Sequence, residues 1–201
     1  MPKRNIPKSN GLVSPANGKV IKIMEIGLSK KWSPKEEQQQ KKMQQKNSIC
    51  IRKGILGKVN ALVADTVKKG HLIIIVMNPF NVHYQRAPTD GKVKSVKHKK
   101  GKLLNAIFKA RNLKPTLENE KNEIIISTKY GRIKVVQVAG IFARRCFSFV
   151  KKNQNIKKGQ IIGVVKMGSQ VCVVIPDSLK PMVFEGQYVV DGETIIAVPT
   201  H

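Results

Sequence analysis

Short apolar runs separated by glycine and other turn residues recur along the chain. Runs of about four to eight apolar residues rich in β-branched side chains and bounded by turns are typical of strands. The predicted strands occupy residues 49–52, 60–67, 72–77, 123–129, 133–138, 147–150, 161–165 and 171–175. This pattern predicts an all-β, mainly antiparallel domain with a few short helices.

Two phrases occur twice, and both repeats predict an internal duplication. PANGKV begins at residue 15 and PTDGKV at residue 88, each as a turn that leads into alternating apolar residues. NQNIKKGQIIGVV, at residues 153–165, has a counterpart in EGQYVVDGETIIAVP, at residues 185–199. Such glycine-bearing turns ahead of short strands resemble the lipoyl and biotinyl carrier domains, whose barrel-sandwich architecture is two-fold repeated. The sequence therefore predicts a duplicated, lipoyl-like β architecture.

Two segments fall outside this pattern. Residues 1–13 are basic and contain two prolines, which predicts a loose N-terminal arm ahead of one domain at residues 14–201. Ser33, with Pro34 next and Glu36 three residues on, has the form of a helix N-terminus with a capping box. Because almost no apolar face follows, we expect an exposed, polar helical insertion near 33–47. Short helical turns are also predicted within 101–123 and 139–145.

The chain is strongly basic. Lys and Arg number 38 against 12 Asp and Glu, a formal net charge of +26. This charge indicates a polyanionic partner, either nucleic acid or an anionic membrane surface. The alternative is a solvated surface that is simply rich in lysine. Aromatic residues make up only 5% of the chain and the sequence has no recognisable nucleic-acid-binding module, so no specific nucleic-acid partner is expected.

The cysteines, the histidines and the hydropathy of the chain bear on its redox compartment, on metal binding and on insertion into a membrane. The three cysteines show no CxxC spacing, which indicates a reducing compartment rather than a disulfide framework. The four histidines form no local metal-binding pair, so no metal site is expected. No apolar run approaches the roughly 18 residues of a membrane span, and the N-terminus lacks an apolar signal core. We therefore expect a cytoplasmic protein whose membrane contact is peripheral.

Five motifs occur in an order that resembles one family. They are SPANG at residues 14–18, NPFNVH with RAP at residues 78–88, LLNA at residues 103–106, ENEKN at residues 118–122, and a stretch from ARR to GS at residues 143–169. Together they resemble the phosphatidylserine decarboxylases, in the short form without a membrane segment. That family has been linked to the barrel-sandwich architecture, so the two resemblances agree.

The resemblance implies a proenzyme that cleaves itself. The Gly168-Ser169 bond would break to give a β chain, residues 1–168, and an α chain, residues 169–201. Ser169 would become a covalent pyruvoyl cofactor, and His83 matches the histidine of the family motif. The implied reaction converts phosphatidylserine to phosphatidylethanolamine at an anionic phospholipid membrane surface. In it, the pyruvoyl carbonyl forms a Schiff base with the headgroup amine and accepts electrons as carbon dioxide departs.

The chemistry of self-cleavage fits these residue types. The Oγ atom of Ser169 must attack the preceding carbonyl carbon, and glycine at position 168 offers the least steric obstruction. A base must take the hydroxyl proton, and neutral His83 can accept a proton near neutral pH and return it. Arg86, Arg144 and Arg145 match basic positions of the family, and a guanidinium near the site can hold a lipid phosphate.

The chain departs from the family pattern at the residue expected to orient the histidine. Asn17 stands where the family has Asp, and an amide stabilises an imidazolium less well than a carboxylate does. Asp90, in the second repeated turn, or Asp65 is an alternative source of that carboxylate. Asn81, close to the motif histidine, also replaces an Asp of the family.

Several alternatives stay open. Gln170 and Cys172 stand where the family typically has Arg and Asp, which removes a charge pair beside the cleavage site and leaves room for a processing-impaired homologue. Archaetidylserine carries the same headgroup, and the sequence does not separate the two lipids. A lipoyl or biotinyl carrier domain is a further alternative, because Lys166-Met167 resembles a biotin attachment context. The sequence also leaves open whether the protein forms a homo-oligomer.

Overall fold

The computed structural model of the protein describes residues 3–27, 53–107, 113–141, 145–165 and 169–200, with the backbone alone for 53–56. The strand predicted at 49–52 and the polar helix predicted near 33–47 lie outside the described residues.

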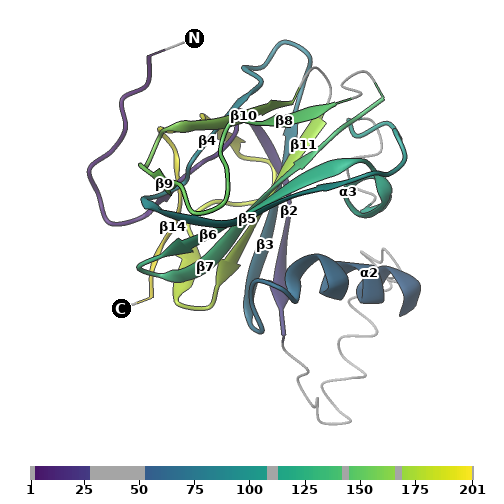
Figure 1. The fold of residues 1–201 in the computed structure, drawn as a ribbon, viewed down its shortest axis with the longest axis horizontal. Coiled ribbons are helices and arrows are strands. Elements are labelled where there is room, and N and C mark those ends of the chain that lie inside the picture. Colours follow the sequence, from purple (N-terminus) through teal and green to yellow (C-terminus); the bar gives the residue numbers. More distant parts are fainter. Residues whose placement is uncertain (1–2, 28–52, 108–112, 142–144, 166–168, 201) are drawn as a thin grey trace.

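The described chain is mostly antiparallel β-sheet with two short helices, α2 (Lys53–Val63) and α3 (Lys114–Glu118). The largest sheet has eight strands in the order β13-β2-β3-β11-β7-β6-β5-β9, and two three-stranded sheets have the orders β1-β14-β12 and β4-β10-β8. Figure 1 shows the large sheet curling, with β4, β10 and β8 along one side of it. The strands are β1 (Leu12–Val13), β2 (Gly18–Ile26), β3 (Gly70–Met77), β4 (Tyr84–Arg86), β5 (Gly91–Lys99), β6 (Lys121–Thr128), β7 (Gly131–Val138), β8 (Cys146–Ser148), β9 (Asn155–Ile156), β10 (Ile161–Val165), β11 (Ser169–Pro176), β12 (Leu179–Pro181), β13 (Tyr188–Val189) and β14 (Ile195–Pro199). The predicted all-β, antiparallel class is confirmed.

The central strands carry the longest apolar runs because both of their faces are buried. In β11, Val171, Val173 and Ile175 belong to the core between the sheets. Cys172 and Val174 alternate with them and belong to a second cluster, on the outer face, together with residues of α2. A strand covered on both faces loses the usual alternation of apolar and polar residues.

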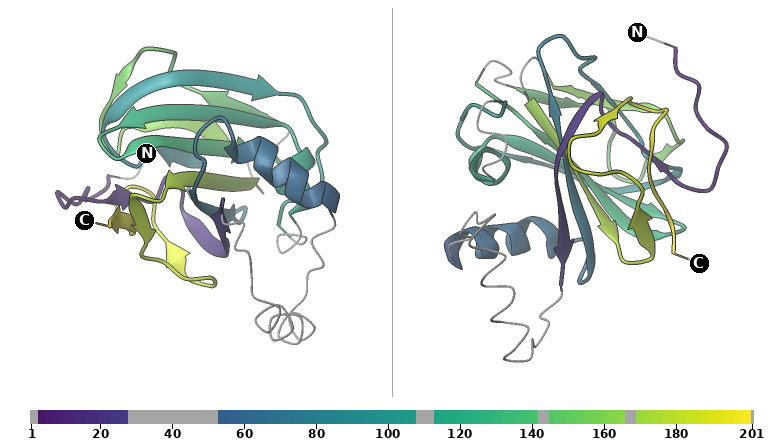
Figure 2. Two further views of the ribbon diagram at one scale, coloured as in Figure 1. Left: turned by 90° about the horizontal axis from the view of Figure 1, so that it is seen from below. Right: turned by 180° about the vertical axis from the view of Figure 1, so that it is seen from behind.

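The prediction of a strand at residues 60–67 is wrong. Helix α2 covers the first part of this stretch, and Val59, Leu62 and Val63 recur along it at the spacing of one helix face. They pack against Leu72 and Ile74 on the outer face of β3. Figure 2 shows α2 on the opposite side of the molecule from β14, the last strand of the chain, drawn in yellow. The apolar run resembles a strand only when the helical residues before it are left out.

The strand pairings repeat about a pseudo-two-fold axis between β11 and β7. On one side β1, β2 and β3 pair with β14, β13 and β11. On the other side β4, β5 and β6 pair with β10, β9 and β7 in the same way. The duplication predicted from the repeated phrases is therefore present in the backbone.

The two repeated turns also bond to each other across this axis. The backbone N–H of Val13 donates to the carbonyl of Pro88 at 2.9 Å, and the N–H of Arg86 donates to the carbonyl of Pro15 at 2.9 Å. Such reciprocal bonds hold the PANGKV and PTDGKV turns side by side in the centre of the fold.

The N-terminal arm is held against the domain, so the expectation of a loose arm is wrong for its described residues. Arg4 donates to Asp191 Oδ1 from Nε at 3.1 Å and from Nη2 at 2.6 Å. Ile6 lies against Gly159 and Gly192, where an added Cβ would overlap its side chain. The arm thus crosses both glycine turns of the second repeated phrase.

Candidate active site

Ser169 is the first residue of β11 and is fully buried. Its Cα pairs with that of Met77, the last residue of β3. The Oγ atom is buried and has no hydrogen-bond partner among the described residues. A buried hydroxyl without a partner costs free energy, so such a group in a native fold calls for an explanation, of which a catalytic role is one. Gly168, on the other side of the predicted cleavage point, lies outside the described residues.

The turn that carries Asn17 lies on the other side of β3. Gly18, the next residue, approaches β3 so closely that a Cβ would overlap the carbonyl oxygen of Val76. Lys19 pairs with Val76, just as Ser169 pairs with the following residue of β3. With adjacent strands about 4.8 Å apart, the Asn17 turn and the start of β11 are separated by about 10 Å. The Oδ1 atom of Asn17 is buried, and no described residue forms a hydrogen bond with it.

His83 lies between β3 and β4, and its backbone ties it to the same end of the fold. Its carbonyl accepts the N–H of Val165 at 3.2 Å and the Nε2 amide of Gln85 at 2.7 Å. Its Nε2 atom is buried and has no hydrogen-bond partner in the part of the chain that the structure describes. Burial lowers the pKa of His83, and a hydrogen bond with the backbone of Asn81 opposes this shift. The imidazole is therefore neutral near pH 7, the form that can accept a proton.

Asn81 fixes the loop before this histidine. Its Oδ1 accepts the N–H of Asn78 at 2.7 Å, and its Nδ2 donates to the hydroxyl of Tyr188 in β13 at 2.5 Å. The amide at this position thus makes a donating contact that an ionised carboxylate cannot make.

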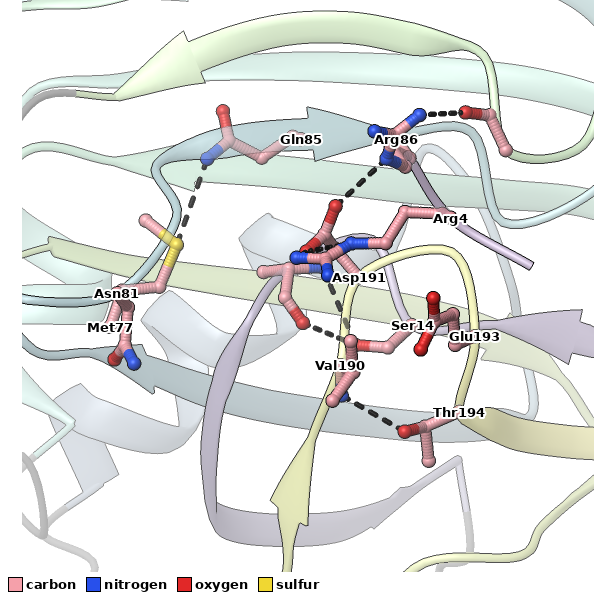
Figure 3. Close-up of polar contacts among 12 residues, drawn as sticks. Arg4, Ser14, Met77, Asn81, Gln85, Arg86, Val190, Asp191, Glu193 and Thr194 are labelled. Atoms are coloured by element: carbon pink, nitrogen blue, oxygen red, sulfur yellow. Dashed lines mark hydrogen bonds and ion pairs between the residues drawn. The ribbon is translucent and has the colours of Figure 1, made fainter. Parts of the chain in front are cut away.

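A ladder of buried amides connects the histidine to the interior. Gln85 Nε2 also lies 3.7 Å from the sulfur of Met77, the strand partner of Ser169, as Figure 3 shows. Gln137 Nε2 donates to Gln85 Oε1 at 2.7 Å, and Asn122 Nδ2 lies 3.3 Å from Gln137 Oε1. Both glutamines are fully buried. These amides were not singled out from the sequence, and their polarity inside an apolar run was the signal that could have found them.

Gln170 and Cys172, which differ from the family pattern beside the cleavage point, both lie in the protein interior. Gln170 is fully buried, its Oε1 accepts the hydroxyl of Thr116 at 2.7 Å, and its Nε2 donates to the carbonyl of Ala106 at 2.8 Å. Cys172 is also buried, and burial raises the pKa of its thiol to about 12. Neither residue carries a charge at neutral pH, and the amide of Gln170 joins the LLNA motif and α3 to β11.

Asn119 joins two motifs to the end of β7. Its Nδ2 donates to the carbonyls of Leu104 at 2.8 Å and Ala139 at 2.7 Å, and its Oδ1 accepts the N–H of Leu104 at 3.0 Å. The ENEKN and LLNA motifs and the end of β7 are thereby joined by one buried side chain. This arrangement explains structurally why an amide residue stands at this position.

Arg86 is held inside the protein by Asp191, a residue that was not predicted as part of the site. Arg86 Nε donates to Asp191 Oδ2 at 2.8 Å, and its Nη1 donates to the carbonyl of Gly159 at 2.8 Å. The side chain of Asp191 is fully buried between Arg86 and Arg4, as Figure 3 shows. These contacts engage the guanidinium within the fold, so its role as a phosphate ligand stays a prediction. Arg145 is exposed and Arg144 lies outside the described residues.

The two alternative carboxylates have other partners. Asp65 pairs with Lys134 Nζ beneath α2. Burial acts to raise the pKa of Asp65, but the hydrogen bond and the charge of Lys134, with a further hydrogen bond from Thr66, lower it overall. Asp90 Oδ1 accepts the backbone N–H of Lys158 at 2.8 Å. Asp90 occupies the place in the second repeated turn that Asn17 occupies in the first.

Comparison with known proteins decides the family. The sequence model described as phosphatidylserine decarboxylase matches residues 1–197. The chain belongs to the phosphatidylserine decarboxylase family. The family model covers all five motifs, and it includes Ser169, His83 and Asn17.

Curated relatives of this family cover part of the chain. The chain is 43% identical over 129 residues to a putative archaetidylserine decarboxylase proenzyme of Methanosarcina barkeri, and 39% identical over 128 residues to one of Methanothermobacter thermautotrophicus. It is 41% identical over 124 residues to a phosphatidylserine decarboxylase proenzyme of Xanthobacter autotrophicus. The matches include 62–64% of this chain and span 61%, 55% and 52% of these relatives, respectively.

Neither helix in the described part of the chain is long and apolar enough to cross a membrane. Over the same residues, no group of three or more His, Cys, Asp or Glu side chains is arranged to hold a metal ion.

Proposed function

We propose that the chain is a self-processing proenzyme that becomes a pyruvoyl-dependent decarboxylase of a serine phospholipid. The observation that carries this proposal is the buried, unpartnered Oγ of Ser169, which starts a central strand at the same end of the fold as His83 and Asn17. The names of the relatives include both phosphatidylserine and archaetidylserine decarboxylases, which share one headgroup. The substrate class is therefore a serine phospholipid.

Self-processing requires one base and one nucleophile. His83 Nε2 accepts the proton of Ser169 Oγ, and Oγ attacks the carbonyl carbon of residue 168. The C–N bond breaks, the released amine takes a proton, and an ester joins the two residues. Loss of the α proton of residue 169 then breaks its Cβ–Oγ bond and releases residue 168 as a carboxylate. Tautomerisation and hydrolysis of the dehydroalanine release ammonia and leave the pyruvoyl group.

The position fits such a group. The side chain of residue 169 is fully buried. The turn that carries Asn17, Met77 and the buried amides linked through Gln85 lie around this end of β11. A pyruvoyl group here supplies a carbonyl that accepts electrons during decarboxylation. The residues of this chain keep water away, hold the strand, and provide a neutral imidazole that can move a proton.

The cleaved chains are expected to stay together. β11 pairs with β3 along its whole length and with β7 over residues 170–174. The α chain would thus contribute the middle strand of the large sheet, and its inner residues belong to the main core. Burial of this strand on both faces holds the two chains without a covalent link.

We further propose peripheral attachment to an anionic membrane. Phe80 is fully exposed in the loop before His83, and Phe184 and Tyr188 are exposed on and beside β13. Asn81 bonds this loop to Tyr188, so the aromatic side chains lie on neighbouring segments. Together with the net charge of +26, they provide apolar and electrostatic contacts for a lipid surface. Co-sedimentation with anionic vesicles that does not weaken with added salt would contradict this attachment.

Intact mass tests the proposed processing. Wild-type protein should yield two chains that divide between residues 168 and 169, with pyruvoyl blocking the new N-terminus. Ser169→Ala should remain one chain. Ser95→Ala is the matched control, because Ser95 Oγ is likewise buried without a hydrogen-bond partner and should be dispensable for cleavage. Wild-type protein that stays full length after long incubation at neutral pH would favour the processing-impaired alternative.

A further inference from the structure

A cavity lies at the end of the fold opposite Ser169. It has a volume of about 310 Å³. Its lining comes from the N-terminal arm (residues 6–11), Thr89 and Asp90 of the second repeated turn, the β6–β7 hairpin (Lys129 and Tyr130), and Lys158. Gly131, next to this hairpin, lies near Pro176, the last residue of β11. Because an eight-residue strand rises about 3.4 Å per residue, this end is roughly 24 Å from the start of β11.

The duplication makes this cavity the counterpart of the Ser169 region. In the first half, Lys19 pairs with Val76 and Ser169 pairs with the next residue, Met77. In the second half, Lys92 pairs with Ser127, and Thr128, the next residue, pairs with Gly131. Gly131 therefore stands where the first half has Ser169. This half has no hydroxyl at that position and cannot undergo the same cleavage.

The cavity carries an excess of positive charge. Lys8, Lys129 and Lys158 line it, and Asp90 is the acidic residue among its lining side chains. The Nζ of Lys129 donates to Asn10 Oδ1 at 2.9 Å, and the Nζ of Lys158 donates to the carbonyl of Ser9 at 3.0 Å. These acceptors are neutral, so they hold the ammonium groups in place without cancelling their charge.

Two further contacts show how the charges are arranged. Asp90 Oδ1 is occupied by the backbone N–H of Lys158, which directs that oxygen toward the main chain. Burial lowers the pKa of Lys158, with Asp90 opposing the shift and Lys129 adding to it. The Nζ of Lys129 also lies 5.1 Å from the centre of the Tyr130 ring. The two lysines are thus close enough to interact, and a bound anion would relieve their repulsion.

We propose that this cavity binds a phosphate group. The three ammonium groups and the hydroxyls of Ser9, Thr89 and Tyr130 supply donors of the kind that bind phosphate oxygens. The volume suits a small phosphate monoester or the phosphate of a lipid headgroup at the lower end of the usual range for ligand sites. This site is independent of the proposed decarboxylation and needs no cleavage of the chain.

Calorimetry with soluble phosphates tests the site directly. Inorganic phosphate and glycerol 3-phosphate are titrated into full-chain Ser169→Ala protein at constant ionic strength. Saturable binding at one site is expected, and the double variant Lys129→Gln/Lys158→Gln should bind about tenfold or more weakly, because two charge-assisted contacts are lost. The matched control, Lys97→Gln/Lys100→Gln, removes the same charge from exposed positions of β5 and its end, away from the cavity, and should bind as the parent does.

Vesicles distinguish the source of the phosphate. If the ligand is a lipid headgroup, phosphatidic acid vesicles should bind the parent and the control more tightly than they bind the double variant, even where soluble phosphates bind weakly.

Asp90→Asn gives an independent test, since it removes a negative charge, keeps an oxygen for the Lys158 N–H, and should tighten binding severalfold. Equal losses in the double variant and its control, or no saturable binding of either kind of probe, would overturn the proposal. Wild-type and Ser169→Ala proteins should bind phosphate equally, whether or not processing occurs.

Discussion

The two repeated turns have the same backbone arrangement but differ in the side chains at matching positions. Gly192 N donates to the carbonyl of Ser14 at 2.8 Å, and Gly159 N donates to the carbonyl of Ala87 at 2.9 Å, so each turn is closed in the same way. The first turn carries Asn17 near Ser169, whereas the second carries Asp90 near a glycine. The nucleophile and the carboxylate are thus in different halves. A duplicated scaffold fixes positions, while single side chains decide what each position can do.

The protein interior also differs between the two ends of the fold: buried amides lie at the Ser169 end, and apolar side chains occupy the corresponding positions at the opposite end. Gln85 of β4 and Gln137 of β7 are buried and bonded to each other at the Ser169 end. The corresponding positions of β1 and β11 are Leu12 and Ile175, which are buried in the apolar core. A polar ladder contributes little net stability compared with apolar packing of the same volume. Its presence at the Ser169 end, and not at these corresponding positions, supports a role in holding the His83 backbone.

The largest expected effect comes from restoring a carboxylate to the first turn. Asn17→Asp should accelerate cleavage, because a carboxylate stabilises the imidazolium that forms when His83 takes the serine proton. The gain has an upper bound of about 10⁴, the cost of the opposite change in a serine protease triad. The rate is measured by intact mass at fixed times after purification.

Two control variants test which of the repeated turns supplies the group that orients His83. His83→Ala should stop cleavage both with Asn17 and with the Asn17→Asp change, since the carboxylate then has no base to orient. Asp90→Asn should leave the rate unchanged, because its partner is the Lys158 backbone. Equal rates for wild type and Asn17→Asp, together with a strong loss in Asp90→Asn, would move the orienting carboxylate to the second turn.

A smaller effect is expected from the buried ion pair between Asp191 of the first half and Arg86 of the second. Asp191→Asn leaves the largely buried guanidinium of Arg86 without its carboxylate and should lower the free energy of unfolding by about 3 kcal/mol. The equivalent position of the second half is Lys158, and Lys158→Gln should cost less than about 1 kcal/mol because that side chain is partly exposed. Urea unfolding of both variants in a Ser169→Ala background, without phosphate, measures the difference. Similar losses in the two variants would show that the halves do not differ in this respect.

Much of the scaffold could be predicted from the sequence because its signals are local. The run at residues 72–77 is apolar throughout and becomes β3, and each repeated turn leads into a strand, β2 or β5, through Gly18 or Gly91. Helix α2 was missed because its periodicity begins before Asn60, where the predicted strand was placed. Local patterns therefore identified the strands on which the site is built.

The contacts that complete the site join residues far apart in the sequence. Asp191 bonds Arg86 over a separation of 105 residues and Arg4 over a separation of 187. No spacing rule connects such positions, although the second repeated phrase gave one signal. It has Asp191 in one copy and Lys158 in the other, and an acid that stands where the repeat has a basic residue is a candidate for a buried ion pair. The roles of Ser169, His83 and Asn17 stay predictions that the variants above test.

The smallest expected effect is a shift in the pH dependence of cleavage. Burial holds the pKa of His83 below its usual value of 6.5, so the imidazole stays neutral, and able to accept the serine proton, down to pH values below 6.5. The wild-type rate should therefore be constant near neutrality and fall only as the pH drops through this lowered pKa. A carboxylate from Asn17→Asp favours the imidazolium and should move the midpoint upward by about one pH unit. Rate constants measured from about pH 5 to 9, with circular dichroism to verify folding, give both midpoints. A wild-type midpoint above 6.5 that does not move in Asn17→Asp would mean that a group other than His83 accepts the proton.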